Sequence, residues 1–341
     1  MRIAVTGSIA TDHLLTFPGR FGDQLIEGEL DKVSLSFLAD ELEVRRGGVA
    51  ANIAFGLGAL GLRPLLVGAV GRDFAEYGRR LEAQGVDTGS VHVSETRHTA
   101  RFICTTDRDQ HQIGTFYAGA MSEARHIALA PVLARAGGLD LVLVSPNDPE
   151  AMLRHTSEAA GLGVAFCADP SQQLARLDGE EVRLLLRGPR VLFTNAYEAQ
   201  LVQERTGWTE RQVLERVGTW VITRGADGAR ILAGGRPAVD VAAVPADGPV
   251  EPTGAGDAFR AGFLAATVRA DDPVRAARLG AALATTALES VGPQAYTLDG
   301  EMLLARIADT YGPEAAADLA PETRTVRAVE TVETAETVGA A

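Results

Sequence analysis

Lysine is almost absent from this chain: Lys32 is the only one among 341 residues. A P-loop requires the sequence Gly-Lys-Ser/Thr, and a protein kinase requires a lysine on a strand together with a distant His-Arg-Asp motif. Neither arrangement occurs here. Any phosphoryl transfer must therefore use a scaffold other than these two.

Cysteine and paired histidines are also scarce. The two cysteines, Cys104 and Cys167, have no CxxC spacing, and the six histidines form no HExxH or paired-ligand pattern. There is no Gly-x-Ser-x-Gly elbow either. A disulfide framework, a zinc site and a serine hydrolase are therefore excluded, and both cysteines are expected to be small core residues.

Long hydrophobic runs and excess positive charge are missing as well. No segment approaches about eighteen apolar residues, and Met1–Gly7 lacks the apolar core of a signal peptide. We therefore expect a cytoplasmic protein without a membrane partner. The net charge of −13 and the pI near 5.0 argue against a nucleic-acid partner. Apolar residues make up 46% of the chain, which is enough for a large core.

Short runs rich in Val, Ile and Leu alternate with helical patterns along the chain. The runs are Ile3–Thr6, Leu65–Val70, Leu139–Val144, Gly163–Ala168, Val191–Thr194 and Trp220–Thr223. This alternation predicts an α/β fold with a doubly wound, mostly parallel sheet and helices on both faces. Ligands of such sheets bind at the carboxyl ends of the strands. The polar residues expected near those ends are Asp12, Asp169, Asn195, Thr223 and Asp257.

Two segments interrupt the alternation, at about residues 13–46 and 99–117. In the second, Arg101–Thr106 and Gln112–Tyr117 flank an Asp-Arg-Asp turn and predict a β-hairpin. Strands inserted at the edge of a sheet can form a small β-sheet lid that excludes water from a phosphoryl transfer. An exposed apolar face on such a lid would also allow a homodimer.

The most informative stretch is Thr253-Gly254-Ala255-Gly256-Asp257, which opens the apolar run Ala258–Val268. Gly254 and Gly256 allow a tight turn with uncovered N–H groups, and the N-terminus of the following helix adds partial positive charge. Phosphate oxygens suit such a cradle, and Asp257 can accept the proton of an attacking hydroxyl. Taken alone, the pattern also fits an ordinary glycine turn with an acidic residue near a helix N-terminus.

A second glycine pair, Gly47-Gly48, opens another helical pattern far upstream. Gly48 can admit a substrate against the backbone, and Asn52, one turn into the helix, can hydrogen-bond it. Asp12, after the first predicted strand, can accept both hydroxyls of a vicinal diol, although a turn residue or helix cap is the commoner role of such an Asp. The three motifs together favour a shared ligand site.

Two other patterns receive no functional interpretation. Gly56–Gly61 matches GxGxxG, but it lies inside the helix begun at Gly48 rather than in a strand-to-helix turn, so close helix packing is the better interpretation. Residues 313–341 are expected to hold the end of a C-terminal helix and a disordered acidic tail of Glu-Thr-Val repeats, with Glu330, Glu333 and Glu336 spaced by three.

Together, the motifs resemble those of the ribokinase-like, PfkB-type carbohydrate kinases. The matching residues are Gly47-Gly48 with Asn52, Asn195-Ala196-Tyr197-Glu198, and Thr253–Asp257. Four further stretches are most similar to bacterial adenosine kinases of this fold: Ile3–His13, Ser34–Leu38, Asp169–Gln173 and Asp257–Phe263. The resemblance implies a kinase domain over residues 1–312 that transfers the γ-phosphate of ATP to the 5′-hydroxyl of adenosine, giving AMP and ADP in purine salvage.

The resemblance also implies roles for individual residues. Asp257 would be the base, and the anion hole would comprise Gly254, Ala255 and Gly256. The nucleoside would be held by Ser8, Asp12, Ser36, Gly48 and Asn52, with Asp12 on the ribose 2′- and 3′-hydroxyls. ATP would lie near Asn195, Thr223, Gly225 and Gly256, and Glu198 would meet Mg²⁺ through water. Glu251-Pro252 stands where many relatives have an Asp, which leaves a monovalent cation open.

Aromatic residues, only 5% of the chain, bear on the choice of substrate. Phe102 and Phe116 occupy the two strands of the predicted hairpin, and stacking of a base on an aromatic ring is worth about 1–3 kcal/mol in nucleic-acid sites. The pair therefore suits a nucleobase clamp, although two Phe residues across a hairpin are more often plain strand packing. Gln172 and Gln173 can add polar contacts, and Arg176 can reach phosphate.

Two other functions stay open. A ribokinase-like kinase for a sugar such as ribose or fructose would need mainly polar contacts, with Phe102 and Phe116 purely structural. A catalytically silent nucleoside-binding protein is the other alternative. Such a protein is expected to lack part of the set Gly254, Gly256 and Asp257, which is complete here.

Overall fold

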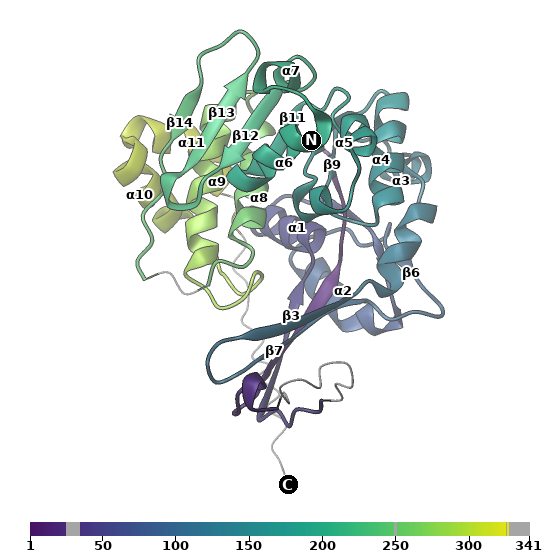
Figure 1. Cartoon of the computed structure of the whole chain (residues 1–341). Coiled ribbons are helices and arrows are strands. Elements are labelled where there is room, and N and C mark those ends of the chain that lie inside the picture. Colours follow the sequence, from purple (N-terminus) through teal and green to yellow (C-terminus); the bar gives the residue numbers. More distant parts are fainter. Residues whose placement is uncertain (25–34, 249–250, 325, 327–341) are drawn as a thin grey trace.

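The central sheet brings together the strands that the sequence predicts. The computed structural model describes residues 1–24, 35–248, 251–324 and 326. In these residues an eight-stranded sheet has the order β14-β13-β12-β11-β10-β9-β1-β4 (Figure 1). Its strands are β1 (Ile3–Thr6), β4 (Leu65–Val67), β9 (Leu141–Val144), β10 (Ala165–Ala168), β11 (Val191–Asn195), β12 (Thr219–Thr223), β13 (Ala229–Ala233) and β14 (Val239–Val241). Within the described residues, two pairings at one edge are antiparallel, β12 with β13 and β13 with β14, and the other five are parallel, which confirms a mostly parallel sheet.

Helices cover both faces of this sheet because alternate residues of each strand point to opposite sides. In β9, Leu141 and Leu143 pack into one buried cluster, and Val142 and Val144 pack into another. The first cluster includes residues of α1 (Val49–Ala59), α2 (Ala75–Ala83), α8 (Ala255–Thr267), α9 (Pro273–Leu288), α10 (Gly300–Tyr311) and α11 (Pro313–Thr323). The second includes residues of α3 (Leu129–Ala136), α4 (Pro149–Gly161), α5 (Gly179–Leu185), α6 (Ala196–Thr206) and α7 (Glu210–Leu214). The predicted doubly wound α/β architecture is confirmed.

A smaller sheet, which we call the lid, extends from one end of the core (Figure 1). Its strand order is β3-β2-β7-β8, and its strands are β2 (Ala10–Thr16), β3 (Glu41–Gly47), β7 (Ala100–Thr106) and β8 (Gln112–Tyr117). β7 and β8 pair antiparallel with Phe102 opposite Phe116, as the hairpin prediction requires. Both predicted insertions therefore contribute strands to one sheet.

Asp12 lies in a different element from the one that the sequence suggests. β2 begins at Ala10, so Asp12 is inside a lid strand rather than in a turn after β1. Its neighbours in the sheet are Arg45 of β3 and Phe102 of β7. Because β2 pairs with both β3 and β7, the chain enters the lid soon after β1, and Asp12 therefore lies on the lid.

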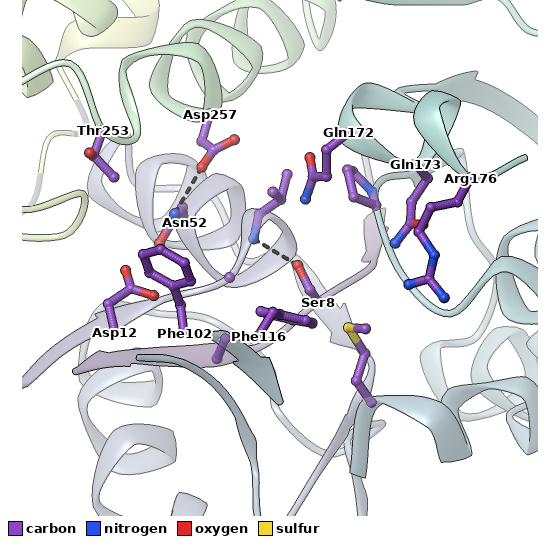
Figure 2. Close-up of a pocket in the computed structure, with 15 residues that line it drawn as sticks. Ser8, Asp12, Asn52, Phe102, Phe116, Gln172, Gln173, Arg176, Thr253 and Asp257 are labelled. Carbon is purple, nitrogen blue, oxygen red and sulfur yellow. Dashed lines mark hydrogen bonds between the residues drawn. The ribbon is translucent and has the colours of Figure 1, made fainter. Parts of the chain in front are cut away.

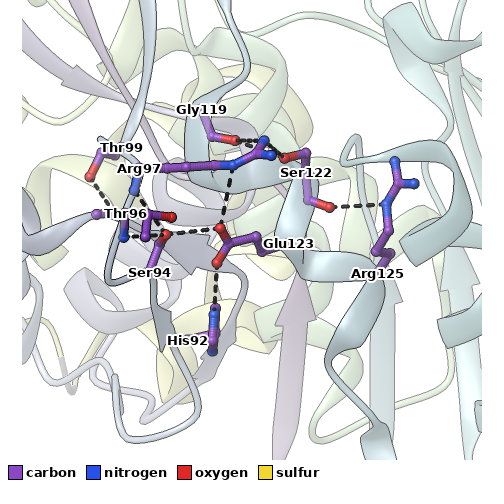
Figure 3. A network of polar contacts seen from close by, with 10 residues as sticks. His92, Ser94, Thr96, Arg97, Thr99, Gly119, Ser122, Glu123 and Arg125 are labelled. Carbon is purple, nitrogen blue, oxygen red and sulfur yellow. Dashed lines mark hydrogen bonds and ion pairs between the residues drawn. The ribbon is translucent and has the colours of Figure 1, made fainter.

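A polar network anchors the two ends of the lid hairpin (Figure 3). Arg97, which precedes β7, donates from Nη1 to Oγ of Ser122 at 2.5 Å. Glu123 accepts from the Ser94 hydroxyl at 2.9 Å and lies 3.0 Å from Nε2 of His92. Ser122 and Glu123 belong to η4 (Gly119–His126), the short helix that follows β8. The base of the hairpin is thus tied to a segment of the core.

The remaining short elements are β5 (Ala69–Val70), which pairs with β6 (His92–Val93), and the 3-10 turns η1 (Phe21–Gln24), η3 (Arg72–Phe74), η5 (Ser171–Ala175) and η6 (Gly225–Asp227). Cys104 and Cys167 are buried and unpaired, as predicted. None of the helices among the described residues is both long and apolar enough to cross a bilayer.

The GxGxxG pattern lies mostly within α1, which confirms that it serves helix packing. A Cβ atom at Gly56 would come within 2.7 Å of Cβ of Ala261 in α8. At the other end of the chain, α11 follows residue 312, the expected end of the domain, and packs on the core through the buried Leu319. Arg275 of α9 donates to Glu322 of α11 at 2.8 Å. Lys32, Ser34 and the expected tail beyond residue 326 lie outside the described residues.

Candidate active site

A cavity of about 470 Å³ lies between the lid and the carboxyl ends of the core strands (Figure 2). This volume falls in the range of about 300–1,000 Å³ that is common for small-molecule sites. Ten of the residues predicted from sequence line it: Ser8, Asp12, Gly48, Asn52, Phe102, Phe116, Gln172, Gln173, Arg176 and Asp257. The structure therefore gathers residues from widely separated motifs into one site.

Asp257 enters the cavity from the first turn of α8. The helix begins after Gly254, whose φ of 83° is left-handed, and a Cβ atom there would lie 2.4 Å from Cβ of Pro293. Glycine is thus required for the turn that aims the helix N-terminus at the cavity. The N–H of Ala255 already donates to the carbonyl of Pro252 at 3.2 Å. Other N–H groups of the first turn have no carbonyl within the helix to bond, so they remain available to an anion.

The pKa of Asp257 is raised to about 6 because burial disfavours the carboxylate. The guanidinium of Arg260 and a hydrogen bond from Asn52 oppose this effect, and the negative charge of Glu198 adds to it. Asn52 donates from Nδ2 to Oδ2 of Asp257 at 2.8 Å. A carboxyl group with these properties is mostly ionised at neutral pH and can accept a proton.

Gly48 and Ser8 form the floor of the cavity at the start of α1. Gly48 has φ 96°, and a Cβ atom there would lie 2.6 Å from the backbone of Ser8 and Ala10. Ser8 Oγ accepts a hydrogen bond from the N–H of Val49 at 3.0 Å. The chain therefore has no room for a side chain at Gly48, and this close backbone packing holds the N-terminus of α1 against the cavity.

The lid contributes an acid and two aromatic rings. Burial raises the pKa of Asp12 to about 6, and the charge of Arg45 partly offsets this shift. Phe102 and Phe116 face the cavity as a cross-strand pair and are 37% and 50% exposed, so part of each ring is open to a ligand. Large exposed aromatic rings in a cavity are a typical feature of ligand sites.

The opposite end of the cavity is polar (Figure 2). Gln173 is fixed by a hydrogen bond from Nε2 to the carbonyl of Asn147 at 2.8 Å, and Gln172 Oε1 accepts from Ser171 at 2.7 Å. The backbone N–H of Arg176 donates to the carbonyl of Gln173 at 2.9 Å, but its guanidinium has neither a hydrogen-bond acceptor nor an ion-pair partner among the described residues. The free polar groups at this end are two donors, the Nε2 of Gln172 and the guanidinium of Arg176, and one acceptor, the Oε1 of Gln173.

The residues expected at the ATP site gather next to the cavity but do not line it. Asn195 and Thr223 are paired at the ends of β11 and β12, and Gly225 follows in η6. Asn195 Oδ1 accepts from the N–H of Glu198, and Glu198 Oε2 accepts from the N–H of Asn195 at 2.7 Å, forming a capping box for α6. Ser36, expected at the nucleoside, is exposed and outside the lining of the cavity.

The acidic residues near the cavity bear on the expected metal. The described residues contain no group of three or more His, Cys, Asp or Glu side chains that could hold an ion. Mg²⁺ usually keeps several waters and binds through one or two carboxylates together with substrate phosphates. Glu198 fits that mode as a single carboxylate close enough to Asp257 to affect its pKa. Glu251, at the position of the expected cation loop, pairs with Arg45 at 2.5 Å.

Several residues of the site were not assigned a role from sequence. Asp169 and Arg260 form a buried ion pair beside Asp257, and Gln294 donates to Asn52. The lining of the cavity is completed by Ala10, Val49, Met121, Pro146 and Thr253. The sequence alone could have indicated that Arg260 lies near Asp257, because a residue three positions further along a helix lies on the same face. Gln294 had no such signal, because it lies in a segment without regular structure.

Comparison with known proteins gives consistent matches. The pfkB family of carbohydrate kinases matches residues 13–299. A nucleoside kinase of Methanothermobacter thermautotrophicus is 32% identical over 79% of this chain and 86% of its own length. A nucleoside kinase of Methanocaldococcus jannaschii is 30% identical over 73% of this chain and 80% of its own length.

Solved structures agree with the sequence matches. The structure of Burkholderia thailandensis nucleoside kinase in complex with inosine superposes with a TM-score of 0.79 at 34% identity. The match covers 91% of this chain and 98% of that one.

Proposed function

This chain belongs to the pfkB family of carbohydrate kinases, and from that premise we propose that it is a nucleoside kinase, which transfers the γ-phosphate of ATP to the 5′-hydroxyl of a nucleoside. The observation that carries the proposal is the division of the cavity into two ends. Asp12 and Asp257 lie at one end, and Gln173 and Arg176 lie at the other (Figure 2). A ribose would occupy the first end, and a base would extend past the Phe rings toward the second.

The proposed chemistry needs a base and a cradle for negative charge. Asp257 accepts the proton of the 5′-hydroxyl while the new O–P bond forms and the bond from the γ-phosphorus to ADP breaks. Asn52 and Arg260 favour the carboxylate form of Asp257, which is the form that can take the proton. The N-terminus of α8, with Gly254 and Gly256 on the expected anion hole, faces the oxygens of the transferred group.

We place ATP beside the cavity, at the ends of β11 and β12. Asn195, Thr223 and Gly225 would contact the nucleotide there, because parallel strands present their carboxyl ends at one edge. Glu198 would meet the waters of Mg²⁺, which supplies positive charge to the phosphates when it is bound with ATP. The proximity of Glu198 to Asp257 supports this placement of the phosphates between the two carboxylates.

Adenosine is the substrate that the resemblance of the sequence implies, and the site has room for a purine. A specific observation favours a second class, the 6-oxopurine nucleosides inosine and guanosine. Arg176 has free N–H donors, and a guanidinium matches the adjacent O6 and N7 acceptors of such a base. Adenine presents an amino donor beside N7, which a guanidinium cannot accept. Arg176→Met is therefore expected to lower kcat/KM more for inosine than for adenosine.

The test of the function is an ADP-release assay with MgATP and a panel of adenosine, inosine, guanosine, ribose and fructose, with Asp257→Asn as the blank. Turnover of nucleosides well above that of the sugars supports the proposal. Turnover of ribose or fructose alone would keep the base and discard the nucleobase site. If no compound is turned over but a nucleoside binds in calorimetry, the chain is a binding protein.

We also propose that the protein forms a homodimer through the outer face of the lid. Residues on that face alternate with those that line the cavity. The exposed apolar ones are Leu42, Val44, Ile103, Ile113 and Tyr117. A contiguous exposed apolar patch is a feature of protein interaction surfaces. A second copy of the lid has the matching face, because a two-fold interface uses the same patch on both subunits.

A further inference from the structure

A chain of hydrogen bonds leads from the catalytic carboxylate to a residue outside the cavity. Asn52 donates from Nδ2 to Asp257 at 2.8 Å, and its Oδ1 accepts from Nε2 of Gln294 at 2.8 Å. Nε2 of Gln294 also donates to the hydroxyl oxygen of Tyr77. The Tyr77 hydroxyl in turn donates to the carbonyl of Gly47 at 2.9 Å. The chain is buried, with Gln294 and Tyr77 each 4% exposed.

The carbonyl of Gly47, at the end of this series, determines which group donates and which accepts in every hydrogen bond of the series. The carbonyl of Gly47 can only accept, so the Tyr77 hydroxyl must give it its single proton. The hydroxyl oxygen is then left as an acceptor, and only the amide nitrogen of Gln294 can donate to it. The second proton of the same nitrogen goes to Oδ1 of Asn52. Asn52 is thereby held with Nδ2, and not Oδ1, toward Asp257.

We propose that Gln294 is a positioning residue for catalysis: it orients the Asn52 amide so that Asp257 stays in the form that can accept a proton. This inference rests on the proposed role of Asp257 as the base. Gln294 does not line the cavity and touches no reacting group. Without its donor, the Asn52 amide can rotate and present oxygen to the carboxylate, and an acceptor facing a carboxyl group favours the protonated acid.

A purely structural role explains Gln294 less well. Its Oε1 is buried and has no hydrogen-bond partner among the described residues. An unsatisfied buried oxygen is destabilising, so an apolar side chain of the same shape would suit packing better. The buried amide is therefore explained by what its nitrogen does.

Other groups also act on Asp257 and must stay unchanged in a test. Arg260 on α8 lowers its pKa, and Glu198 on α6 raises it. Asp169, at the end of β10, and the buried Tyr296 also interact with its charge. None of these four is bonded to Gln294 among the described residues.

The experiment compares Gln294→Met with Arg80→Met. Methionine keeps the length of the side chain and removes the donor. Arg80 donates to the backbone carbonyl of Gln294 at 3.2 Å, so Arg80→Met disturbs the same segment without touching the amide chain. We expect Gln294→Met to move the acidic limb of the kcat profile up by about half to one pH unit, with little change in nucleoside KM. Arg80→Met should leave the limb in place.

A direct measurement separates this inference from the proposed function. The pKa of Asp257 can be followed by ¹³C NMR of labelled Asp carboxyl groups, assigned by the loss of its signal in Asp257→Asn. A higher pKa in Gln294→Met supports the positioning role even if no nucleoside is turned over. An unchanged pKa in a folded Gln294→Met protein overturns it, whatever the kinase assay shows.

Two further variants guard against ambiguity. If Gln294→Met does not fold, Tyr77→Phe removes the acceptor that orients Gln294 and should raise the pKa of Asp257 in the same direction. In an Asn52→Ala background, Gln294→Met should have no additional effect on that pKa, because the residue through which it acts is gone. Additive shifts in the double variant would contradict the proposal.

Discussion

Asp169 and Arg260 form an ion pair in the interior, with Nε of Arg260 2.6 Å from Oδ2 and Nη2 2.7 Å from Oδ1 of Asp169. The two residues are 91 positions apart in sequence. Arg260 lies one turn after Asp257 on α8, and its charge lowers the pKa of the proposed base. Asp169 thus holds the guanidinium of Arg260 behind the site and partly offsets its charge within the core.

Removal of one partner of this pair should be strongly destabilising. Asp169→Ala removes the ion-pair partner of the buried Arg260, and we expect a loss of about 3–5 kcal/mol in the free energy of unfolding. The control is Asp271→Ala, which breaks the ion pair of Asp271 with Arg190 at 2.7 Å, where Asp271 is 80% exposed. That change should alter stability by less than about 1 kcal/mol. Urea denaturation measures both, and equal losses would contradict the buried pair's importance.

The pH dependence of kcat should report the protonation of Asp257. Its pKa is raised to about 6, and only the carboxylate can act as the base, so activity is present above that pH and is lost as the pH falls through it. At saturating nucleoside we expect kcat to fall about tenfold per pH unit on the acid side. kcat/KM should fall more steeply, because the pKa of Asp12 is also raised to about 6. A kcat that stays constant well below pH 6 would remove Asp257 from this role.

Phe102→Ala should weaken nucleoside binding without harming the chemistry. Loss of stacking worth about 1–3 kcal/mol corresponds to a rise in nucleoside KM of about fivefold to more than a hundredfold. The matched control is Ile103→Ala, since Ile103 is 38% exposed against 37% for Phe102 but points to the outer face of the same strand. Steady-state kinetics with one nucleoside and both variants decides the matter. Similar KM values for the two would favour the sugar kinase.

Gly254 and Gly256 should respond differently to alanine. Gly254 has φ 83° and would place Cβ 2.4 Å from Pro293, whereas φ of Gly256 is not left-handed and a Cβ atom there would lie 3.1 Å from Nη1 of Arg260. We expect Gly254→Ala to lower the melting temperature clearly, because a left-handed backbone conformation at a residue other than glycine is destabilising by about 1–3 kcal/mol. Gly256→Ala should melt near the wild type. Differential scanning fluorimetry tests this contrast, and the reverse order would contradict the geometry of the turn.

The exposed apolar residues on the outer face of the lid predict that the protein is a dimer in solution. Leu42 and Val44 are 61% and 52% exposed on the outer face of β3, so a double change to Glu would place charges in the proposed interface. Light scattering after gel filtration should give twice the mass of the chain for the wild type and the single mass for the variant. Leu184→Glu, at a 38% exposed position on α5, should remain a dimer. A monomeric wild type would end the proposal.

Local patterns were enough to predict most of the fold and part of the site. Strand runs, the hairpin and the two glycine-led helices are encoded in neighbouring residues, so β1, β7, β8 and the starts of α1 and α8 lie close to where the sequence indicates. Asn52 and Asp257 were found in this way as well, because each lies in the first turn of its helix.

The other parts of the site depend on contacts between residues that are far apart in sequence, and local sequence patterns do not indicate such contacts. Asp12 is placed by the register of β2 against β3 and β7, where it lies opposite Arg45 and Phe102. Gln294 bonds to Asn52 across 242 positions. Contacts of this kind are decided by tertiary packing, and a single sequence gives no signal for them.

The glycine at position 56 has a consequence for how the site tolerates change. α1 and α8 approach so closely there that a methyl group would overlap Ala261, and the same two helices carry the amide and the carboxylate that are 2.8 Å apart. The distance between α1 and α8 therefore determines the length of the hydrogen bond between Asn52 and Asp257. Gly56 and Ala261 do not line the cavity, yet a bulkier side chain at either position would push α1 and α8 apart and lengthen the hydrogen bond between Asn52 and Asp257.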